Sequence, residues 1–184
     1  LFLKTPLSPN MITVLSLFIG LISAFFFLKG SYENNLIGAC LLLLSAWIDC
    51  TDGEIARLKF SESKIGGKLD ILCDNLVHFS VFFAIGMGLY QSTGNKNFLY
   101  FGALAVIGSL ISFLILSSSI IDKKEKISAN TTDPKKSNTL TDNIANRDFI
   151  YFLFFMSLIS KVDIFICITA LGSNIFAAFL TYSK

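Results

Sequence analysis

The chain has 184 residues, of which 53% are apolar and 15% charged, and its formal net charge is +2. Its mean hydropathy is +0.67. This composition excludes an ordinary soluble globule, and a charge so near zero gives no reason to expect a nucleic-acid partner. The four cysteines lie in or beside apolar runs without a CxxC pair, so we interpret them as small buried side chains and not as metal ligands or disulfides.

The apolar runs predict an all-α integral membrane protein with six transmembrane helices. A hydrocarbon core of about 30 Å needs roughly 18 to 25 mostly apolar residues in a helix. Four such runs cover residues 11–28, 35–57, 68–92 and 98–121. The final apolar stretch, 149–182, is too long for one span and is interrupted by polar residues at 160–163, so it predicts two shorter helices.

The remaining segments are expected to lie at the membrane surface. Residues 1–10, which contain Pro6 and Pro9, predict a short interfacial segment in front of a six-helix membrane domain at 11–184. The polar stretch 122–146 predicts a cytoplasmic loop or a partly helical linker. Because the chain begins with Leu1 and has no signal-peptide pattern, we expect it to be a fragment of a longer protein.

The distribution of Lys and Arg predicts the orientation of the domain. Only Lys29, Lys96 and Lys161 fall in the turns on one side. The other twelve basic residues fall on the opposite side: Lys4, Arg57, Lys59, Lys64, Lys68, Lys123, Lys124, Lys126, Lys135, Lys136, Arg147 and Lys184. Since positive residues favour the cytoplasmic side, we expect both termini and residues 49–74 to face the cytoplasm, in an inner or plasma membrane.

Four aspartates at the ends of two apolar runs predict a metal site. Asp49 and Asp52 are three residues apart, and Asp70 and Asp74 are four apart, so each pair shares one face of a helix. A charge at the bilayer centre costs about 2.5–3.5 kcal/mol, so the carboxylates are expected to converge on a hydrated pocket. An all-oxygen ligand set favours a hard ion such as Mg²⁺, Mn²⁺ or Ca²⁺ over zinc.

The residues that follow the first aspartate pair suit a phosphate ligand. Gly53 and Ala56 keep the acidic face low enough for a ligand to approach the backbone, and Arg57 offers a planar fork to phosphate oxygens. The alternative is that the two small residues serve helix packing and that Arg57 is an ordinary cytoplasmic flank. Their combination with the aspartates favours the phosphate interpretation.

These positions together resemble a known family signature. Asp49-x-x-Asp52-Gly53-x-x-Ala56-Arg57, eight further residues, and then Gly66-x-x-x-Asp70-x-x-x-Asp74 match the motif of the CDP-alcohol phosphotransferases, which are membrane enzymes with six core helices. The opening Ser8-Pro-Asn-Met-Ile-Thr13 is similar to the Pro-Asn stretch before the first helix of that family. The signature covers 26 residues directly and departs from the motif at none of its positions.

The resemblance implies an enzyme of phospholipid or inositol-phosphate-type biosynthesis. It would transfer a substituted phosphate group from a CDP-alcohol donor to an acceptor alcohol and release CMP. The family pattern implies two ions, Mg²⁺ or Mn²⁺, held by the four aspartates, with Asp74 also acting as general base. It further implies a nucleotide site, to which we assign Asn10, Thr13, Asp49, Asp52, Gly53, Ala56, Arg57 and Gly66.

The sequence leaves the donor and acceptor open. The donor is either CDP-diacylglycerol or a soluble CDP-alcohol, and Arg147 and Lys123 are candidate contacts for a phosphorylated acceptor, although both also fit as cytoplasmic flanks. The opening of the fifth span, at 145–155, resembles the branch of the family that is fused to an upstream cytidylyltransferase-like domain. We also expect a homodimer in the lipid bilayer.

One further residue and one other function fit parts of the sequence pattern. His78, one turn after Asp74, suits either a partner of the site or an interhelical packing group, and the second is commoner for a lone histidine. A cation transporter or channel would also place carboxylates in the membrane, but it predicts acidic residues at several depths, whereas the four aspartates cluster.

Overall fold

The structure is a computed structural model that describes residues 9–58, 64–129 and 139–182; at 9, 52–58, 64, 65, 68, 116–129 and 139–147 the backbone alone is described. Every element in these ranges is an α-helix. The helices are α1 (Pro9–Phe27), α2 (Tyr32–Leu58), α3 (Lys64–Thr93), α4 (Asn97–Ala129), α5 (Thr139–Leu158) and α6 (Val162–Tyr182). The expected all-α fold and the break in the last apolar stretch are therefore confirmed.

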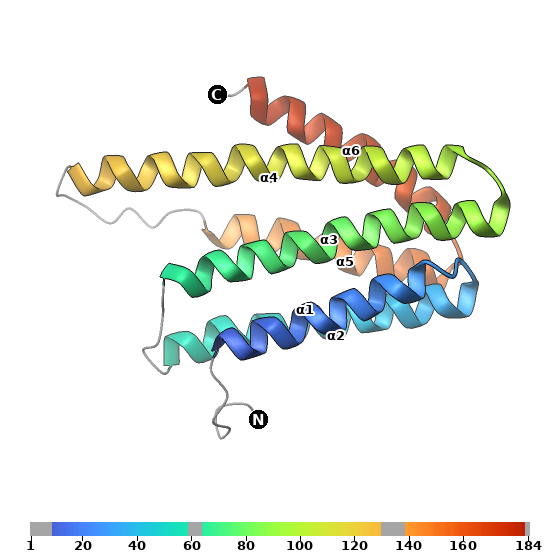
Figure 1. Cartoon of the computed structure of the whole chain (residues 1–184), viewed down its shortest axis with the longest axis horizontal. Coiled ribbons are helices and arrows are strands. Elements are labelled where there is room, and N and C mark those ends of the chain that lie inside the picture. Colours follow the sequence, from blue (N-terminus) through green and yellow to red (C-terminus); the bar gives the residue numbers. More distant parts are fainter. Residues whose placement is uncertain (1–8, 59–63, 130–138, 183–184) are drawn as a thin grey trace.

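The helices form an elongated bundle in which neighbours along the chain run in opposite directions (Figure 1). Helix α1 packs against α2 and α3, α4 packs against α3 and α6, and α5 packs against α2. The turns α1–α2, α3–α4 and α5–α6 lie at one end of the bundle, while α1 begins and α6 ends toward the other end (Figure 1). We call these the turn end and the terminal end.

Five of the described helices are long and apolar enough to cross a membrane. Their apolar segments are Asn10–Phe27, Tyr32–Thr51, Leu69–Thr93, Asn97–Ile115 and Val162–Tyr182. Helix α5 differs because its apolar part is shorter, covering Asp148–Leu158. The six predicted helices are present, but six full spans are not established.

The polar stretch 122–146 is helical where it is described. Helix α4 continues to Ala129, eight residues past the expected limit of the fourth span, and α5 already begins at Thr139. Of its two expected forms, the described part therefore corresponds to the partly helical linker. Pro9 and Asn10, which we assigned to the interfacial segment, belong to α1, and the rest of that segment lies outside the described residues.

Left-handed residues close the helices at the turn end. Gly30 (φ 66°), Gly94 (φ 70°) and Ser160 (φ 57°) follow α1, α3 and α5, the conformation that commonly ends a helix. Gly30 also fills a second role, because a Cβ there would overlap the carbonyl oxygen of Gly88 in α3. The turn end is thus fixed by both backbone conformation and close packing.

Small and apolar side chains bring the helices together in the core. Phe27, Val81, Leu153 and Phe165 come from four different helices, are at most 1% exposed and belong to one cluster to which all six helices contribute. At the α3–α4 crossing, a Cβ on Gly86 would lie 2.9 Å from the Cα of a glycine in α4. Such close backbone approach is typical of helix packing in membranes.

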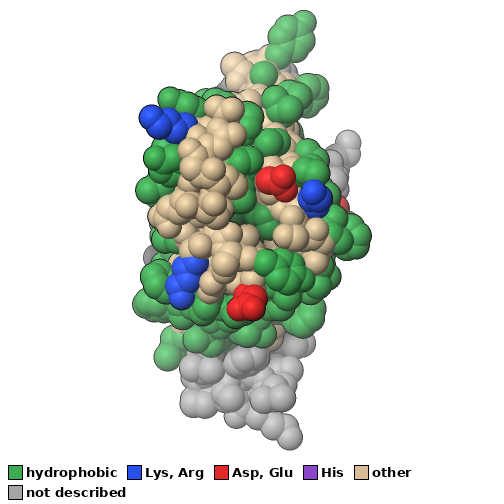
Figure 2. Space-filling view, turned by 90° about the vertical axis from the view of Figure 1, so that its right-hand side faces the viewer, with side chains coloured by type: hydrophobic (Ala, Val, Ile, Leu, Met, Phe, Trp, Pro, Cys, Tyr) green, Lys and Arg blue, Asp and Glu red, His purple; other side chains and the backbone are tan. Residues whose placement is uncertain are grey.

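The outer surface suits a lipid environment. Leu171, Ile175 and Phe179 on α6 are 64–68% exposed, which is unusual for large apolar side chains in water. Figure 2 views the turn end, where charged and uncharged polar groups lie among the backbone atoms and apolar side chains border them. An apolar perimeter around a polar end is the pattern expected of an integral membrane protein.

Candidate metal and substrate site

Three of the four predicted metal-binding aspartates meet between α2 and α3. Asp49 lies on the C-terminal part of α2, whereas Asp70 and Asp74 lie one turn apart near the start of α3. Each offers a carboxylate oxygen, and these oxygens lie within 4.8 Å of one another. All three residues are half-buried, and Oδ1 of Asp70 is shielded from solvent. The group lies toward the terminal end of the bundle.

The donor set fits a hard divalent cation. Oxygens that bind one Mg²⁺, Mn²⁺ or Ca²⁺ ion at about 2.0–2.6 Å are separated by up to about 4–5 Å across the ion, which matches the observed spread. Three ionised carboxylates this close repel each other, and a cation between them would remove that repulsion. Asp52, three residues after Asp49 on the same helix, falls among the residues whose side chains are not described.

Helix α1 contributes a hydroxyl group to the site. Oγ of Ser16 lies 3.0 Å from Oδ1 of Asp49 and 2.8 Å from the carbonyl oxygen of Thr13, and can donate its hydrogen to either. Ser45, one turn before Asp49 on α2, donates to the carbonyl oxygen of Ser16 at 2.7 Å. Ser16 and Thr13 are each 3% exposed, so a pair of helix-to-helix contacts holds α1 beside Asp49.

The sequence alone did not single out Ser16, although a signal was present. Thr13, Ser16, Gly20 and Ser23 recur every three or four residues in an otherwise apolar helix, and all four are buried. This stripe of small and hydroxylated residues faces α2 and α3, since Ser23 donates to the carbonyl oxygen of Gly38 at 2.8 Å and Gly20 adjoins Val77. Its period identifies it as a packing face.

The other predicted site residues have different placements. Asn10 is exposed in the first turn of α1, and Gly66 is half-buried one turn before Asp70. The backbones of Gly53, Ala56 and Arg57 lie on the last turns of α2, those of Lys123 and Arg147 on α4 and α5, and their side chains lie outside the description. The assignments of these residues to nucleotide and acceptor stay predictions.

His78 packs between helices. Its ring makes an edge contact with Phe149 of α5, with centroids 4.8 Å apart, and a looser stacked contact with Phe82, at 6.5 Å. These contacts support the packing interpretation of this histidine.

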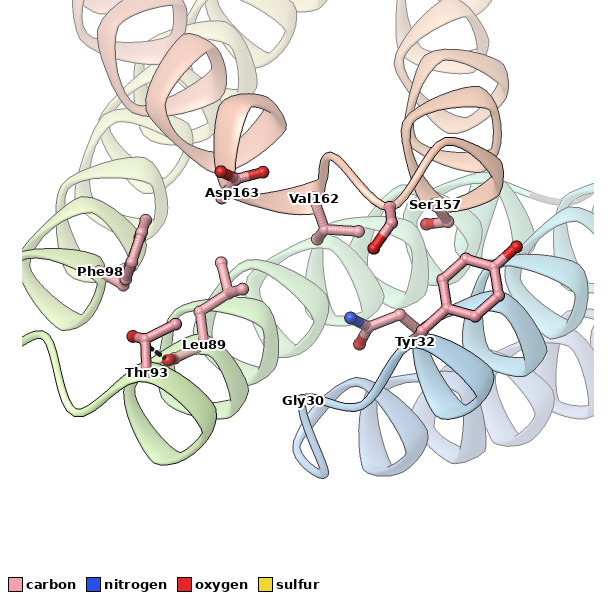
Figure 3. Close-up of a pocket in the computed structure, with 10 residues that line it drawn as sticks. Gly30, Tyr32, Leu89, Thr93, Phe98, Ser157, Val162 and Asp163 are labelled. Carbon is pink, nitrogen blue, oxygen red and sulfur yellow. Dashed lines mark hydrogen bonds between the residues drawn. The ribbon is translucent and has the colours of Figure 1, made fainter.

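A separate cavity of about 220 Å³ lies at the turn end, away from the aspartates, and is lined by residues of several helix ends (Figure 3). Much of its polar lining already serves those ends. The hydroxyl of Tyr32 donates to the carbonyl oxygen of Leu158, and that of Thr93 donates to Leu89. Asp163 lies in the first turn of α6, where a carboxylate is favoured. This cavity therefore has a structural explanation and is not the candidate active site.

A comparison with protein families matches residues 6–178 to the CDP-alcohol phosphatidyltransferase model. The chain belongs to the CDP-alcohol phosphatidyltransferase family. This confirms the resemblance deduced from the aspartate motif. It also confirms, at the level of the family, the expected membrane transferase of substituted phosphate groups.

The chain is similar to curated relatives that are named as different enzymes. The chain is 27% identical over 168 residues to an archaetidylinositol phosphate synthase of Pyrococcus horikoshii, covering 91% of the chain and 78% of that protein. It is 35% identical over 130 residues to a CDP-diacylglycerol–serine O-phosphatidyltransferase of Helicobacter pylori, covering 70% of the chain and 49% of that protein. It is 33% identical over 91 residues to a bifunctional IPC transferase and DIPP synthase of Aquifex aeolicus, and that match covers 50% of the chain and only 20% of the relative.

Solved structures share the fold. A phosphatidylinositol phosphate synthase of Mycobacterium tuberculosis with CDP-DAG bound superposes with a TM-score of 0.73 at 16% identity, covering 98% of this chain and 88% of that one. The same enzyme in complex with manganese and citrate gives a TM-score of 0.63 at 19% identity, covering 98% and 84%. At these identities the similarity establishes the fold of the bundle.

Proposed function

We propose that this domain transfers a substituted phosphate group from a CDP-alcohol to an acceptor alcohol at the aspartate site between α2 and α3. The observation that carries the proposal is the meeting of Asp49, Asp70 and Asp74 within 4.8 Å of one another. Asp49 comes from a different helix from the other two, so the cluster depends on the fold. A shared ion requires carboxylates that converge in this way.

The proposed roles follow from the family motif and from this geometry. Asp49, Asp52, Asp70 and Asp74 hold Mg²⁺ or Mn²⁺, for which we expect two ions. The bound metal supplies charge neutralisation at the pyrophosphate of the donor. Gly53, Ala56, Arg57 and Gly66 line the nucleotide site, and Asn10 and Thr13 border it from α1.

The proposed reaction is a substitution at phosphorus. The acceptor oxygen forms a new bond to the β-phosphorus, the bond from that phosphorus to the CMP oxygen breaks, and CMP leaves with the bonding electrons. The proton of the acceptor hydroxyl passes to the carboxylate of Asp74. That carboxylate is half-buried and lies on the same helix as Asp70, so it is reachable from the site and held by a regular backbone.

The substrates are proposed as classes. The donor is CDP-diacylglycerol or a soluble CDP-alcohol, which agrees with the CDP-DAG named for the mycobacterial enzyme of the same fold. The relatives named as inositol phosphate and serine enzymes support an alcohol acceptor, phosphorylated or not. Arg147 and Lys123 are the proposed contacts for an acceptor phosphate.

The orientation in the membrane is also proposed. Lys29, Lys96 and Lys161 lie in or beside the three turns at the turn end, away from the aspartates, which supports a cytoplasmic site and cytoplasmic termini. A homodimer stays a prediction. An ion pathway would need acidic groups at successive depths, whereas the grouped carboxylates of the described residues lie toward one end.

The test is CMP release by the purified protein with Mg²⁺ or Mn²⁺, a panel of CDP-linked donors and a panel of alcohol acceptors. We expect release with at least one pair, its loss in EDTA, and its loss in Asp70→Asn. Binding of a CDP-alcohol without CMP release from any pair would contradict the proposed reaction. Metal-dependent cation flux through proteoliposomes, with no CDP binding, would replace it with a transport function.

A further inference from the structure

We propose that Ser16 is a positioning residue for Asp49, so that α1 takes part in building the metal site. This inference rests on the proposed function, because it concerns a ligand of that site. The groups at the site come from three helices. Asp49 of α2 and Asp70 of α3 belong to the cluster, and Ser16 of α1 contacts it. The hydroxyl of Ser16 is a contact through which α1 reaches the cluster.

The contact is partly buried and within hydrogen-bond distance. Ser16 is 3% exposed, and its Oγ lies 3.0 Å from Oδ1 of Asp49. A hydrogen bond to an ionised carboxylate is about twice as strong as one between neutral groups. Accepting this bond leaves the carboxylate further lone-pair positions for an ion, because the two oxygens together offer about four.

Ser16 is itself anchored next to Asp49. Ser45 donates to the backbone carbonyl oxygen of Ser16 at 2.7 Å, and Ser45 precedes Asp49 by one turn on the same face of α2. One bond therefore fixes the backbone of Ser16 on α2, and the other directs its hydroxyl at the carboxylate. The first bond does not involve the Ser16 side chain, so it survives replacement of that side chain.

The fold alone does not require the contact with Asp49. A serine in an apolar helix can satisfy its hydroxyl on a carbonyl of its own helix, and the carbonyl oxygen of Thr13 lies 2.8 Å away. The hydroxyl would therefore have a partner without Asp49, and the additional contact joins α1 to a carboxylate of the site. It does restrict the rotation of a metal ligand, and partners of metal ligands typically change metal affinity by about 10–100-fold.

Ser23 provides a matched control on the same helix. It is 0% exposed and also joins α1 to α2, because it donates to the carbonyl oxygen of Gly38 at 2.8 Å. Ser23 lies two turns from Ser16, toward the turn end. Its replacement by Ala therefore removes a buried hydroxyl between the same two helices without touching a carboxylate.

The experiment measures Mn²⁺ binding to the purified full chain in lipid nanodiscs, without substrate, from the electron paramagnetic resonance signal of free Mn²⁺. We expect Ser16→Ala to raise the Kd for Mn²⁺ by about tenfold or more. Ser23→Ala should leave the Kd within about twofold of the unmodified protein, although it lowers the Tm because it removes a buried hydrogen bond. An equal Kd for the two variants would overturn the positioning role.

A second pair of variants covers poor folding of Ser16→Ala. Ser16→Thr and Ser16→Val introduce side chains of the same shape that differ in the hydroxyl group. We expect the Thr variant to bind Mn²⁺ more tightly than the Val variant, and equal affinities would overturn the proposal.

The outcomes separate this inference from the proposed reaction. If the unmodified protein binds Mn²⁺ but releases no CMP, the reaction fails while the effect of Ser16 on metal affinity still stands. If CMP release and metal binding are both normal in Ser16→Ala, the positioning role fails and the reaction stands. If the unmodified protein binds no Mn²⁺, both fail.

Discussion

Replacing Asp49 by Asn should stabilise the metal-free protein and abolish its stabilisation by metal. In the metal-free state Asp49 faces two other carboxylates at up to 4.8 Å. With an effective dielectric constant of about 20, each ionised pair at this distance costs roughly 3 kcal/mol. Water and salt reach these half-buried groups, so we expect a realised relief of about 1–3 kcal/mol in total.

The effect is measurable as a shift of the thermal midpoint. For a chain of this size, 1 kcal/mol corresponds to about 2–4 °C, so Asp49→Asn should raise the Tm in EDTA by roughly 2–12 °C. Saturating Mg²⁺ should raise the Tm of the unmodified protein and leave that of the variant unchanged, because only a bound ligand shifts the folding equilibrium.

Tryptophan fluorescence can follow this thermal unfolding close to the site. Trp47 is the only tryptophan of the chain, and it precedes Asp49 by two residues on α2. Its Nε1 donates to the hydroxyl of Tyr151 on α5 at 3.4 Å, so separation of these helices should change its fluorescence. Asp163→Asn at the turn end is the matched control, and it should show neither effect. A lower Tm of Asp49→Asn in EDTA, together with an undiminished response to Mg²⁺, would refute the reasoning.

Three further changes probe packing and substrate binding. Gly86→Ala should cost about 1–3 kcal/mol of unfolding free energy, because its Cβ would lie 2.9 Å from the α4 backbone, while Gly172→Ala, which meets no atom within 4 Å, should not lower the Tm. Ser157→Ala should be neutral or slightly stabilising, because Oγ of Ser157 is buried with no hydrogen-bond partner among the described residues. Ser23→Ala should cost about 1 kcal/mol, because it removes a buried hydrogen bond. A larger loss of Tm in Ser157→Ala than in Ser23→Ala would show that the hydroxyl of Ser157 is engaged. Arg147→Ala should raise the KM for a phosphorylated acceptor without weakening CDP binding, and an unchanged KM in steady-state assays would reduce Arg147 to a flanking charge.

The helices were predictable because hydrocarbon length and helical rise constrain them strongly. Apolar runs located the first three helices to within a few residues, although α4 continues eight residues past its predicted limit, and the polar residues at 160–163 correctly divided the last two helices. The weakest prediction concerned the shortest apolar element, α5. A count of apolar residues establishes that Asp148–Leu158 is buried or in lipid, but a stretch of this length does not determine whether its helix crosses the bilayer.

The carboxylate cluster was predictable from spacing, whereas its support was not. Aspartates three and four residues apart must share a helix face, and a short link between two helices makes those faces meet. Nothing in that spacing indicates which residue of α1 lies opposite Asp49. The stripe that contains Ser16 and Ser23 shows only that α1 has a packing face, and the register between α1 and α2 decides which serine reaches the carboxylate.

The two ends of the bundle differ in the kind of contact that holds them together. At the turn end, Gly30, Gly94 and Ser160 close three helices, and neighbouring backbones touch. Part of the polar lining of the cavity there is already bonded to helix ends. At the terminal end, hydroxyl groups join α1 to α2, and carboxylates of α2 and α3 lie close together. A site that must admit and release a nucleotide is better built on the second kind of contact, because side chains can exchange partners without moving the helices that carry them. The hydrogen bonds from Ser45 to Ser16 and from Ser16 to Asp49 combine both properties, since one holds backbone and the other holds a ligand.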